Sequence, residues 1–455
     1  MTLKSINPYD GSLIASYDQV SEDKLEELLD KSAYQWVEWR ATPFNKRKSL
    51  LEETAKILRE RKEQYASLIT REIGKAINES RGEIEKCAWV CEYYAENAQR
   101  FLISEEVTTE YSKAQIDYQP LGPILAVMPW NFPFWQVFRF AAPNLMAGNV
   151  AILKHASNAT GCSLAIQQLF LDAGFPEGTF LSLLLRGSET SKLISDSRIA
   201  GVTLTGSTLA GKAVAEAAGK SIKKSVLELG GSDPYLILED ADIDLAVEKC
   251  VAGRLMNAGQ SCIGAKRFIV VASVYDKFIK KFIAKMKMAK VGDPTEDDTH
   301  VGPLASKQFR EELHFQVEKS IEKGAVLELG GEVPEGKGAF YPPTVLSNVS
   351  KGMPAYDEEL FGPVASVIMV DDEDAAIEVA NDTNFGLGAA VFTTDLKRGE
   401  RIASDSIRAG AVFVNDFVKS DPRLPFGGIK ESGYGRELSL YGIREFMNVK
   451  TIVVS

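Results

Sequence analysis

The sequence predicts an α/β fold in which mostly parallel sheets carry helices on both faces. Three observations predict it. The first hundred residues place apolar side chains at helical spacing, and from about residue 107 short apolar runs begin to alternate with helical segments. A second alternation of the same kind follows from about residue 235. This order of elements is typical of parallel sheets, which bind their ligands at the carboxyl ends of the strands.

The individual elements follow from periodicity and from the residues that flank them. Helices are expected at 25–39, 47–73, 78–102, 135–147, 160–173, 189–195, 209–218, 243–257 and 275–288. Strands are expected at 107–111, 114–118, 123–127, 150–153, 179–184, 201–205, 225–229, 235–238, 268–271, 364–370, 389–392 and 411–414. The β-rich tail at 449–455 is an edge strand that needs cover, so pairing with another subunit is expected.

Composition excludes several classes of protein. The 455 residues are 45% hydrophobic and 25% charged, with a formal net charge of −11, which predicts a soluble protein and disfavours binding to nucleic acid. No apolar run approaches the roughly 20 residues of a membrane span, and the N-terminus has no apolar signal core, so a cytoplasmic location is expected. Five sparse cysteines indicate reduced thiols, and three scattered histidines argue against a metal site.

Cys262 lies between small and polar residues in the segment 257–262, where a thiol has little to pack against. Such surroundings favour an exposed and reactive thiol over a buried one. Glu228 stands in the apolar run 226–229, which leads into two glycines. A carboxylate in this environment should have a raised pKa, which suits a general base near neutral pH. Because the chain has so few histidines, a cysteine nucleophile would have to be activated by another group.

The segment 204–213 follows an expected strand and opens an expected helix. It nearly matches the phosphate-binding loop G-x-x-x-x-G-K-[ST], but Ala213 replaces the hydroxyl residue that would bind magnesium. This substitution disfavours a phosphate-loop nucleotide-binding protein that hydrolyses its nucleotide. A glycine turn with free helix N–H groups still suits a phosphate, and a plain strand-to-helix turn remains the alternative.

Three further residues have a functional interpretation and a structural alternative. Lys154 follows an apolar strand, so it either points into the ligand crevice or is solvated. The Asn131 amide stands between two prolines that fix the backbone, which suits a preorganised oxyanion donor or a structural turn. Arg139 lies in an apolar helix and needs a partner, which is either an internal carboxylate or a ligand.

Taken together, these segments resemble the aldehyde dehydrogenase superfamily over nearly the whole chain. Six motifs occur in family order: Pro129-Trp130-Asn131-Phe132-Pro133, the Lys154 segment, Thr205-Gly206-Ser207, Glu228-Leu229-Gly230-Gly231, Gly259-Gln260-Ser261-Cys262 and Glu359-Leu360-Phe361-Gly362-Pro363-Val364. The resemblance implies a Rossmann-like cofactor domain at 1–106 and 120–229 and an α/β catalytic domain at 230–432. It also implies a small β oligomerisation arm with the C-terminal tail, at 107–119 and 433–455, and a homodimer or homotetramer.

The resemblance also implies roles in the oxidation of an aldehyde to a carboxylate. Cys262 would be the nucleophile, and the Asn131 amide with the Cys262 backbone N–H would hold the oxyanion. Loss of one such donor typically costs about 10²–10³ in rate. A thioester would remain on Cys262 after hydride transfer, and Glu228 would activate the water that hydrolyses it. The presence of this base argues against relatives that transfer the acyl group to coenzyme A.

The family positions for the cofactor are filled by Trp130, Lys154, Ser157, Gly206, Ser207, Leu229, Glu359 and Phe361. Many NAD-preferring relatives have glutamate where this chain has Ser157. Its carboxylate binds the ribose hydroxyls and repels a 2′-phosphate. Because Ser157 removes that repulsion and Lys154 is near in sequence, the chain is expected to prefer NADP and to accept NAD.

Within the superfamily, the closest resemblance is to bacterial succinate-semialdehyde dehydrogenases. It is carried by the segments 154–158 and 419–428. It implies that Arg139 and Ser420 bind the distal carboxylate of the substrate. Some relatives have an additional arginine at the position of Met256, so one carboxylate contact is missing here. A broader aldehyde dehydrogenase that acts on glutarate semialdehyde or on uncharged aldehydes is the alternative.

Overall fold

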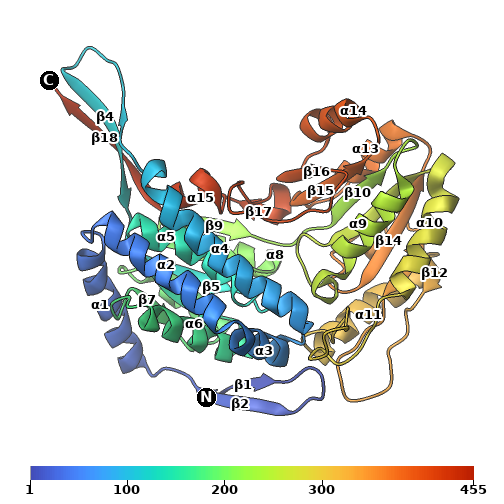
Figure 1. Cartoon of the computed structure of the whole chain (residues 1–455), viewed down its shortest axis with the longest axis horizontal. Coiled ribbons are helices and arrows are strands. Elements are labelled where there is room, and N and C mark those ends of the chain that lie inside the picture. The colour runs from blue at the N-terminus through green and yellow to red at the C-terminus, as the bar shows by residue number, and fades with distance from the viewer. Residues whose placement is uncertain (1) are drawn as a thin grey trace.

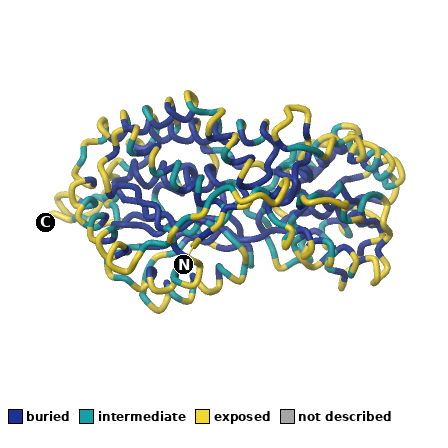
Figure 2. Tube along the Cα trace, turned by 90° about the horizontal axis from the view of Figure 1, so that it is seen from below, coloured by how far each residue is buried: buried dark blue, intermediate teal, exposed yellow. Residues whose placement is uncertain are grey.

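The computed structural model describes residues 2–455 and has two α/β bodies and a protruding arm (Figure 1). The chain builds one body first, crosses into the second after residue 228, and returns to the first near its C-terminus. The interior of the chain is buried, while exposed positions concentrate on its outer surface (Figure 2). No helix among residues 2–455 is long and apolar enough to cross a membrane.

The first body is built on a six-stranded sheet in the order β17-β9-β8-β5-β6-β7. Its pairs are parallel except for β17, which lies antiparallel to β9. The bounds are β5 Pro123–Met128, β6 Val150–His155, β7 Phe180–Ser182, β8 Gly201–Thr205, β9 Lys224–Glu228 and β17 Gly433–Tyr434. This alternating order brings the carboxyl ends of β5, β6, β8 and β9 to one edge of the sheet.

Helices cover both faces of this sheet because alternate strand residues point to opposite sides. Ile124 and Ala126 of β5 pack into the large cluster that includes α4 and α5, whereas Leu125 packs into a separate cluster with Leu25 and Leu29 of α1. The helices are α1 Glu22–Trp39, α2 Phe44–Glu60, α3 Lys62–Ile73, α4 Ile77–Phe101, α5 Trp135–Ala147, α6 Thr160–Asp172, α7 Thr190–Ser195 and α8 Thr208–Lys220. The helix expected at 47–73 is two helices, because the backbone leaves the helical range at Arg61.

The second body holds a seven-stranded sheet in the order β12-β13-β14-β11-β10-β15-β16. Only the edge strand β12 is antiparallel to its neighbour. The strands are β10 Asp233–Ile237, β11 Ala265–Val271, β12 Val326–Leu329, β13 Thr344–Ser347, β14 Val364–Val370, β15 Gly388–Phe392 and β16 Ala411–Val414. The main helices are α9 Ile243–Leu255, α10 Ala272–Lys287, α11 Lys307–Glu322, α12 Pro354–Asp357, α13 Glu373–Asn381, α14 Leu396–Arg401 and α15 Ser439–Arg444, the last of which packs on the first body.

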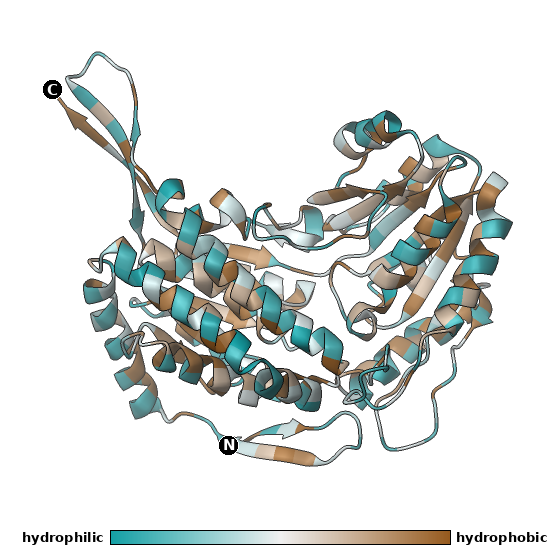
Figure 3. Ribbon diagram, in the orientation of Figure 1, coloured by the Kyte–Doolittle hydropathy of each residue, from teal (hydrophilic) through white to brown (hydrophobic). Residues whose placement is uncertain are grey.

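The arm consists of β18 Met447–Val454 and β4 Lys113–Pro120, which pair antiparallel over their full length, with the short β3 Glu105–Glu106 alongside. β18 is the apolar strand of this projection (Figure 3). The strand expected at 107–111 is wrong: these residues form an exposed loop, in which the Thr109 hydroxyl accepts a hydrogen bond from the Tyr111 backbone. A hairpin of β1 Thr2–Ile6 and β2 Leu13–Asp18, β12, β13 and α11 were not expected from the sequence.

Candidate active site

A strained turn after α9 presents Cys262. Asn257, Ala258 and Gly259 have consecutive positive φ angles of 53°, 51° and 74°. Two of these residues carry a Cβ, so the left-handed conformation costs energy that the surroundings must offset. Gly259 is required, because a Cβ there would lie 2.2 Å from the Gly362 carbonyl oxygen. A buried turn held in such a conformation is typical of a functional loop.

Buried polar groups hold this turn in place. The Arg254 guanidinium donates to the Gly259 carbonyl at 2.6 Å, and Glu79 of α4 accepts from the Asn257 backbone N–H at 2.8 Å. Lys266 of β11 donates to the carbonyl oxygens of Ser261 and Cys262 at 2.9 and 2.8 Å. All three side chains come from regular elements, so the loop is fixed by the rigid parts of both bodies.

Cys262 lies where two cavities meet and contributes to the wall of each. The other four cysteines are buried, whereas Cys262 is partly exposed, in agreement with its expected accessibility. Burial raises the pKa of Cys262 to about 12, and the nearby charges of Arg139 and Lys266 oppose this shift. The thiol is therefore protonated at neutral pH, and its proton must leave when the sulfur attacks.

Asn131 follows β5 and faces the Cys262 loop. Its Nδ2 donates to the Gln260 carbonyl at 3.0 Å, and its Oδ1 accepts from the Gln136 side chain at 3.0 Å. The Asn257 side chain donates to the Asn131 carbonyl at 2.7 Å. A side-chain amide has two N–H donors, so one remains for a ligand in the cavity that Asn131 shares with Cys262.

Glu228 ends β9 but does not line either cavity that contains Cys262. Its Oε1 lies against Gly427, since a Cβ there would be 2.6 Å from this oxygen. Neither carboxyl oxygen has a hydrogen-bond partner within residues 2–455. Burial raises the pKa of Glu228 well above its usual value, an effect that Arg139 opposes and Glu437 reinforces. This environment matches the expected raised pKa, but the side chain must rotate to reach a bound acyl group.

The cavity on the cofactor side has a volume of about 260 Å³. It gathers six of the eight predicted cofactor residues around Cys262 and Asn131: Trp130, Gly206, Ser207, Leu229, Glu359 and Phe361. Glu359 accepts from the Gly231 backbone N–H at 3.1 Å and lies 3.2 Å from the Lys266 ammonium. Gly230 keeps this position open, because a Cβ there would be 2.4 Å from a Glu359 oxygen. The predicted residues therefore converge on one crevice at the carboxyl edge of the sheet.

The remaining two predicted cofactor residues lie further along the same edge. Lys154 pairs in register with Val127 near the end of β6, and burial lowers the pKa of its ammonium. Ser157 lines a separate cavity of about 480 Å³. Phe309 lies in the walls of both this cavity and the cofactor-side cavity. The wall of this second cavity has no carboxylate and three lysines, namely Lys4, Lys307 and Lys337.

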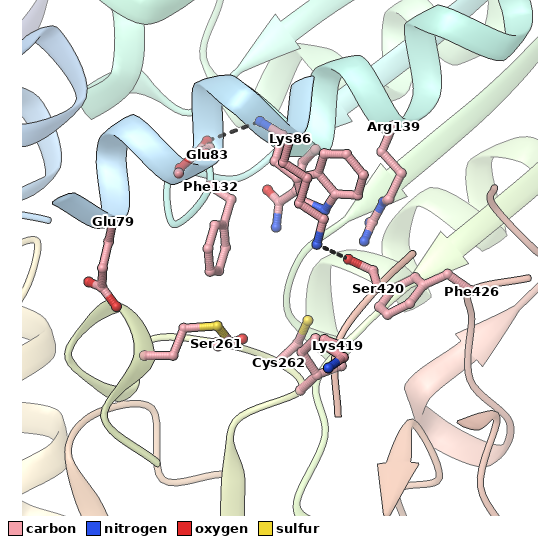
Figure 4. Close-up of a pocket in the computed structure, with 15 residues that line it drawn as sticks. Glu79, Glu83, Lys86, Phe132, Arg139, Ser261, Cys262, Lys419, Ser420 and Phe426 are labelled. Carbon is pink, nitrogen blue, oxygen red and sulfur yellow. Dashed lines mark hydrogen bonds between the residues drawn. The ribbon is translucent and has the colours of Figure 1, made fainter. Parts of the chain in front are cut away.

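The cavity on the other side of Cys262 has a volume of about 310 Å³. Arg139 and Ser420 both line it, so both predicted substrate residues lie in the same wall (Figure 4). The Arg139 guanidinium is paired with Glu437, donates to the Thr205 hydroxyl at 3.1 Å, and stacks over Phe426 at 4.6 Å. The internal partner considered for Arg139 thus exists, and its binding of a substrate stays a prediction.

Sequence reasoning missed three charged residues of α4 in the wall of this cavity: Glu79, Glu83 and Lys86. Their spacing of four and three residues places them on one helix face. This face meets the start of α5 and the Cys262 turn, where Glu83 accepts from the Phe134 and Trp135 backbone N–H groups and Glu79 from that of Asn257. Charged residues at positions that a helix otherwise fills with apolar side chains are a signal that could have found them.

Comparison with known proteins identifies the family and the fold. Residues 1–452 match the sequence profile of the aldehyde dehydrogenase family. The chain belongs to this family. It is 49% identical to a probable NADP(+) succinate-semialdehyde dehydrogenase of Synechocystis sp., over all of both chains, and 47% identical to the NAD(P)+ succinate semialdehyde dehydrogenase Sad of Escherichia coli, over 98% of this chain and 97% of that one.

A solved structure of a succinic semialdehyde dehydrogenase from Streptococcus pyogenes, in complex with NADP+, superimposes with a TM-score of 0.97. It is 39% identical and covers 99% of each chain. Membership of the family confirms the fold class expected from the sequence, and NAD(P)-dependent aldehyde oxidation is the activity of the family.

Lys266 offers a first test of this site, because its ammonium contacts both the Cys262 carbonyl and Glu359. We expect Lys266→Met to reduce kcat/KM by roughly 10–100-fold, since it leaves buried acceptors without a donor. Because Lys266 lowers the pKa of Cys262, the pH profile of Cys262 alkylation should also move to higher pH.

The matched control is Lys249→Met, which removes a lysine of α9 whose ammonium lies 3.4 Å from Asp416, away from the thiol. It should leave both readouts near wild type. An unchanged alkylation profile in Lys266→Met would contradict the positioning role.

Proposed function

We propose that this protein oxidises succinate semialdehyde to succinate, with NADP as its preferred hydride acceptor and NAD as an alternative. The observation that carries the proposal is the place of Cys262 between two cavities. One is lined by residues expected to hold a dinucleotide. The other combines apolar walls with three cationic side chains, Lys86, Arg139 and Lys419, and two carboxyl groups, Glu79 and Glu83. The names of the relatives support the same substrate and cofactor.

In the first step the Cys262 sulfur attacks the aldehyde carbon, and the thiol proton passes through water to Glu228, which releases it to solvent before the hydrolysis step. The carbonyl oxygen becomes an oxyanion, which accepts from the second N–H of the Asn131 amide and from the Cys262 backbone N–H. Because Asn131 is already held by Gln260 and Gln136, its donor is oriented before the charge develops. The product of this step is a thiohemiacetal on Cys262.

When bound, the nicotinamide accepts the hydride that leaves the former aldehyde carbon. The chain's residues hold the acceptor: Glu359 would bind the ribose hydroxyls, and the Gly206–Ser207 turn, which begins α8, would receive the pyrophosphate. Collapse of the oxyanion leaves a thioester on Cys262. Glu228 then rotates from Gly427 into the cavity, takes a proton from water, and the resulting attack releases the carboxylate and the thiol.

Substrate and cofactor preference are tested together by assaying a panel of aldehydes with each cofactor. The panel contains succinate semialdehyde, glutarate semialdehyde and butanal. The proposal expects the highest kcat/KM for succinate semialdehyde with NADP. Comparable values for butanal would favour the broader aldehyde dehydrogenase. Magnesium-dependent ATP hydrolysis without aldehyde oxidation would favour the phosphate-loop protein.

The cofactor preference leads to a specific prediction at Ser157. Its cavity contains three lysines and no carboxylate, which suits the 2′-phosphate that distinguishes NADP from NAD. Ser157→Glu should lower kcat/KM for NADP on the order of 10²-fold, because like charges repel, and should change the value for NAD much less.

Ser157→Gln is the matched control, since it adds a similar volume without the charge and should lose far less activity with NADP. A wild-type enzyme that strongly prefers NAD would contradict the assignment.

We also propose that the protein is a cytoplasmic homodimer or homotetramer that assembles through its arm. Val449, Val453 and Val454 of β18 are exposed in the isolated chain, and an uncovered apolar edge strand is a natural pairing surface. The two separate sheets and the projecting β4–β18 pair support the proposed division into a cofactor domain, a catalytic domain and an arm. Five free cysteines fit a reducing compartment.

A further inference from the structure

Five charged side chains line the substrate cavity, and three of them, Glu83, Arg139 and Lys419, have an oppositely charged partner within the chain. The Glu79 carboxyl accepts from the Asn257 backbone N–H, and burial raises its pKa to about 7. The carboxylate of Glu83 is paired with the buried Lys75 and caps the backbone N–H groups at the start of α5. The Arg139 guanidinium is paired with Glu437. The Lys419 ammonium lies 2.6 Å from Asp416. The Glu83 and Arg139 pairs are buried and satisfy the requirement that buried charges have partners, whereas the Lys419 pair is exposed to solvent.

Lys86 differs from the other cations of this cavity. Within residues 2–455 no carboxylate oxygen lies within 4.0 Å of its ammonium. Its hydrogen-bond partner is the neutral Ser420 hydroxyl at 2.8 Å, and the ammonium sits over the Trp135 ring at 4.3 Å. The closest acidic residue in sequence to Ser420 is Asp421, which is engaged by Arg423 at 2.6 Å. A desolvated cation without an anion is an incomplete pair.

The ammonium and the hydroxyl together have the donors that a carboxylate requires. Lys86 uses one of its three N–H donors on Ser420, and the Ser420 oxygen acts as the acceptor, which leaves its own O–H free to donate. Figure 4 shows Lys86 and Arg139 reaching from α4 and α5 toward Ser420, with Cys262 across the cavity from them. An aldehyde with an anionic group at its far end can therefore place its carbonyl at Cys262 and its charge at this pair.

We propose that Lys86 and Ser420 form the receptor for the distal carboxylate of the substrate, and that Lys86 supplies the unpaired positive charge that selects a carboxylate-bearing aldehyde. This inference rests on the proposed function and deepens it. Arg139 forms the neighbouring wall, with its charge already matched by Glu437. Met256, in the same cavity, carries no charge where some relatives have an arginine. Lys86 would supply the positive charge that is missing at that position.

The ionisation of Lys86 is consistent with this role. Burial, and then the charge of Arg139, lower the pKa of Lys86 to about 8, while Asp421 and Glu83 oppose the shift. An anion bound to the ammonium would stabilise its charged form. Lys86 is thus mostly charged at neutral pH, and a bound carboxylate would stabilise this charged form further.

The test compares succinate semialdehyde with butanal, which lacks the carboxylate. For Lys86→Met we expect KM for the semialdehyde to rise on the order of 10²-fold, because an anion would lose its charged partner in a desolvated site. The kinetic constants for butanal should change by less than about threefold, which also shows that the variant folds and that its nucleophile works. Lys86→Arg should restore much of the preference, since it keeps the charge.

Lys419→Met is the matched control, because it removes a lysine from the same wall whose ammonium is already paired with Asp416. Its selectivity should stay within about threefold of wild type. Equal losses on both aldehydes in Lys86→Met, or an unchanged preference, would overturn the receptor. A larger loss of selectivity in Lys419→Met than in Lys86→Met would also overturn it.

Inhibition by succinate separates this inference from the proposed substrate. With butanal as the substrate, succinate should inhibit the wild type competitively, and Lys86→Met should weaken this inhibition by a similar factor. If the wild type oxidises succinate semialdehyde poorly but loses succinate inhibition in Lys86→Met, the receptor stands and the proposed substrate is wrong. If the wild type prefers the semialdehyde and Lys86→Met is inhibited by succinate as strongly as the wild type, the proposed function stands and the receptor is wrong.

Discussion

Cys262→Ala is expected to reduce aldehyde oxidation by roughly 10⁴–10⁶-fold, the range typical for loss of a covalent nucleophile. Cys262 lines both cavities. The other four cysteines of the chain are buried and line neither of them. The measurement is kcat/KM for succinate semialdehyde with NADP, together with the dissociation constant for NADP from fluorescence titration.

NADP binding should survive in this variant, because the residues predicted to hold the dinucleotide, Gly206, Glu359 and Lys154, are separate from the thiol. Cys250→Ala is the matched control, since Cys250 is fully buried in α9 and contacts neither cavity. It should lose stability rather than turnover. Residual activity above about 1% of wild type in Cys262→Ala would contradict covalent catalysis by this residue.

Glu228→Gln is expected to slow steady-state turnover by roughly 10²–10⁴-fold while leaving the first turnover largely intact. Glutamine cannot take a proton from water, so acylation continues and hydrolysis of the thioester fails. Rapid mixing should therefore show a burst of NADPH close to one equivalent per site, followed by a slow steady state.

The pH dependence gives a second readout of Glu228. Burial raises its pKa, and a general base works only when it is deprotonated. In the wild type kcat should therefore increase as the pH rises through this raised pKa, and Glu228→Gln should lack that increase. A wild type whose kcat falls as the pH rises from 6 to 8, or a variant without a burst that still binds NADP, would contradict the assignment.

The sequence predicted the local parts of the site because each part lies in one short segment. The strands that lead to Asn131, Lys154 and Gly206 follow from apolar runs, and the structure places these residues along the edge of one sheet. Regular helices such as α4 and α5 were predicted within a residue or two, since their periodicity extends over several turns.

The partners of the site residues were beyond sequence reasoning because they come from distant segments. Arg139 meets Glu437, and Lys86 meets Ser420, 334 positions further along the chain. A single sequence contains no signal for such a pair. The left-handed turn at Asn257 and Ala258 was also hidden, because neither residue type requires a positive φ and the conformation depends on the groups packed around it.

Local propensity differs from the structure where tertiary contacts or hydroxyl groups decide the backbone conformation. The alternating residues 107–111 resemble a strand, but pairing with β4 ends after the hydrogen bond from the Val107 N–H to the Ala114 carbonyl, and the segment continues as a loop. The orientation of Glu228 is a second case. Its position on β9 was predictable, whereas its contact with Gly427 depends on a loop nearly 200 residues later.

The central claim is that a thioester forms on Cys262 and is hydrolysed with the help of Glu228. Its most direct test is mass spectrometry of Glu228→Gln, quenched in acid shortly after mixing with NADP and succinate semialdehyde. We predict a succinyl adduct on the peptide that contains Cys262, in an amount equal to the NADPH burst, and only a trace in the wild type at steady state. A burst of NADPH without an adduct on Cys262 would contradict the account.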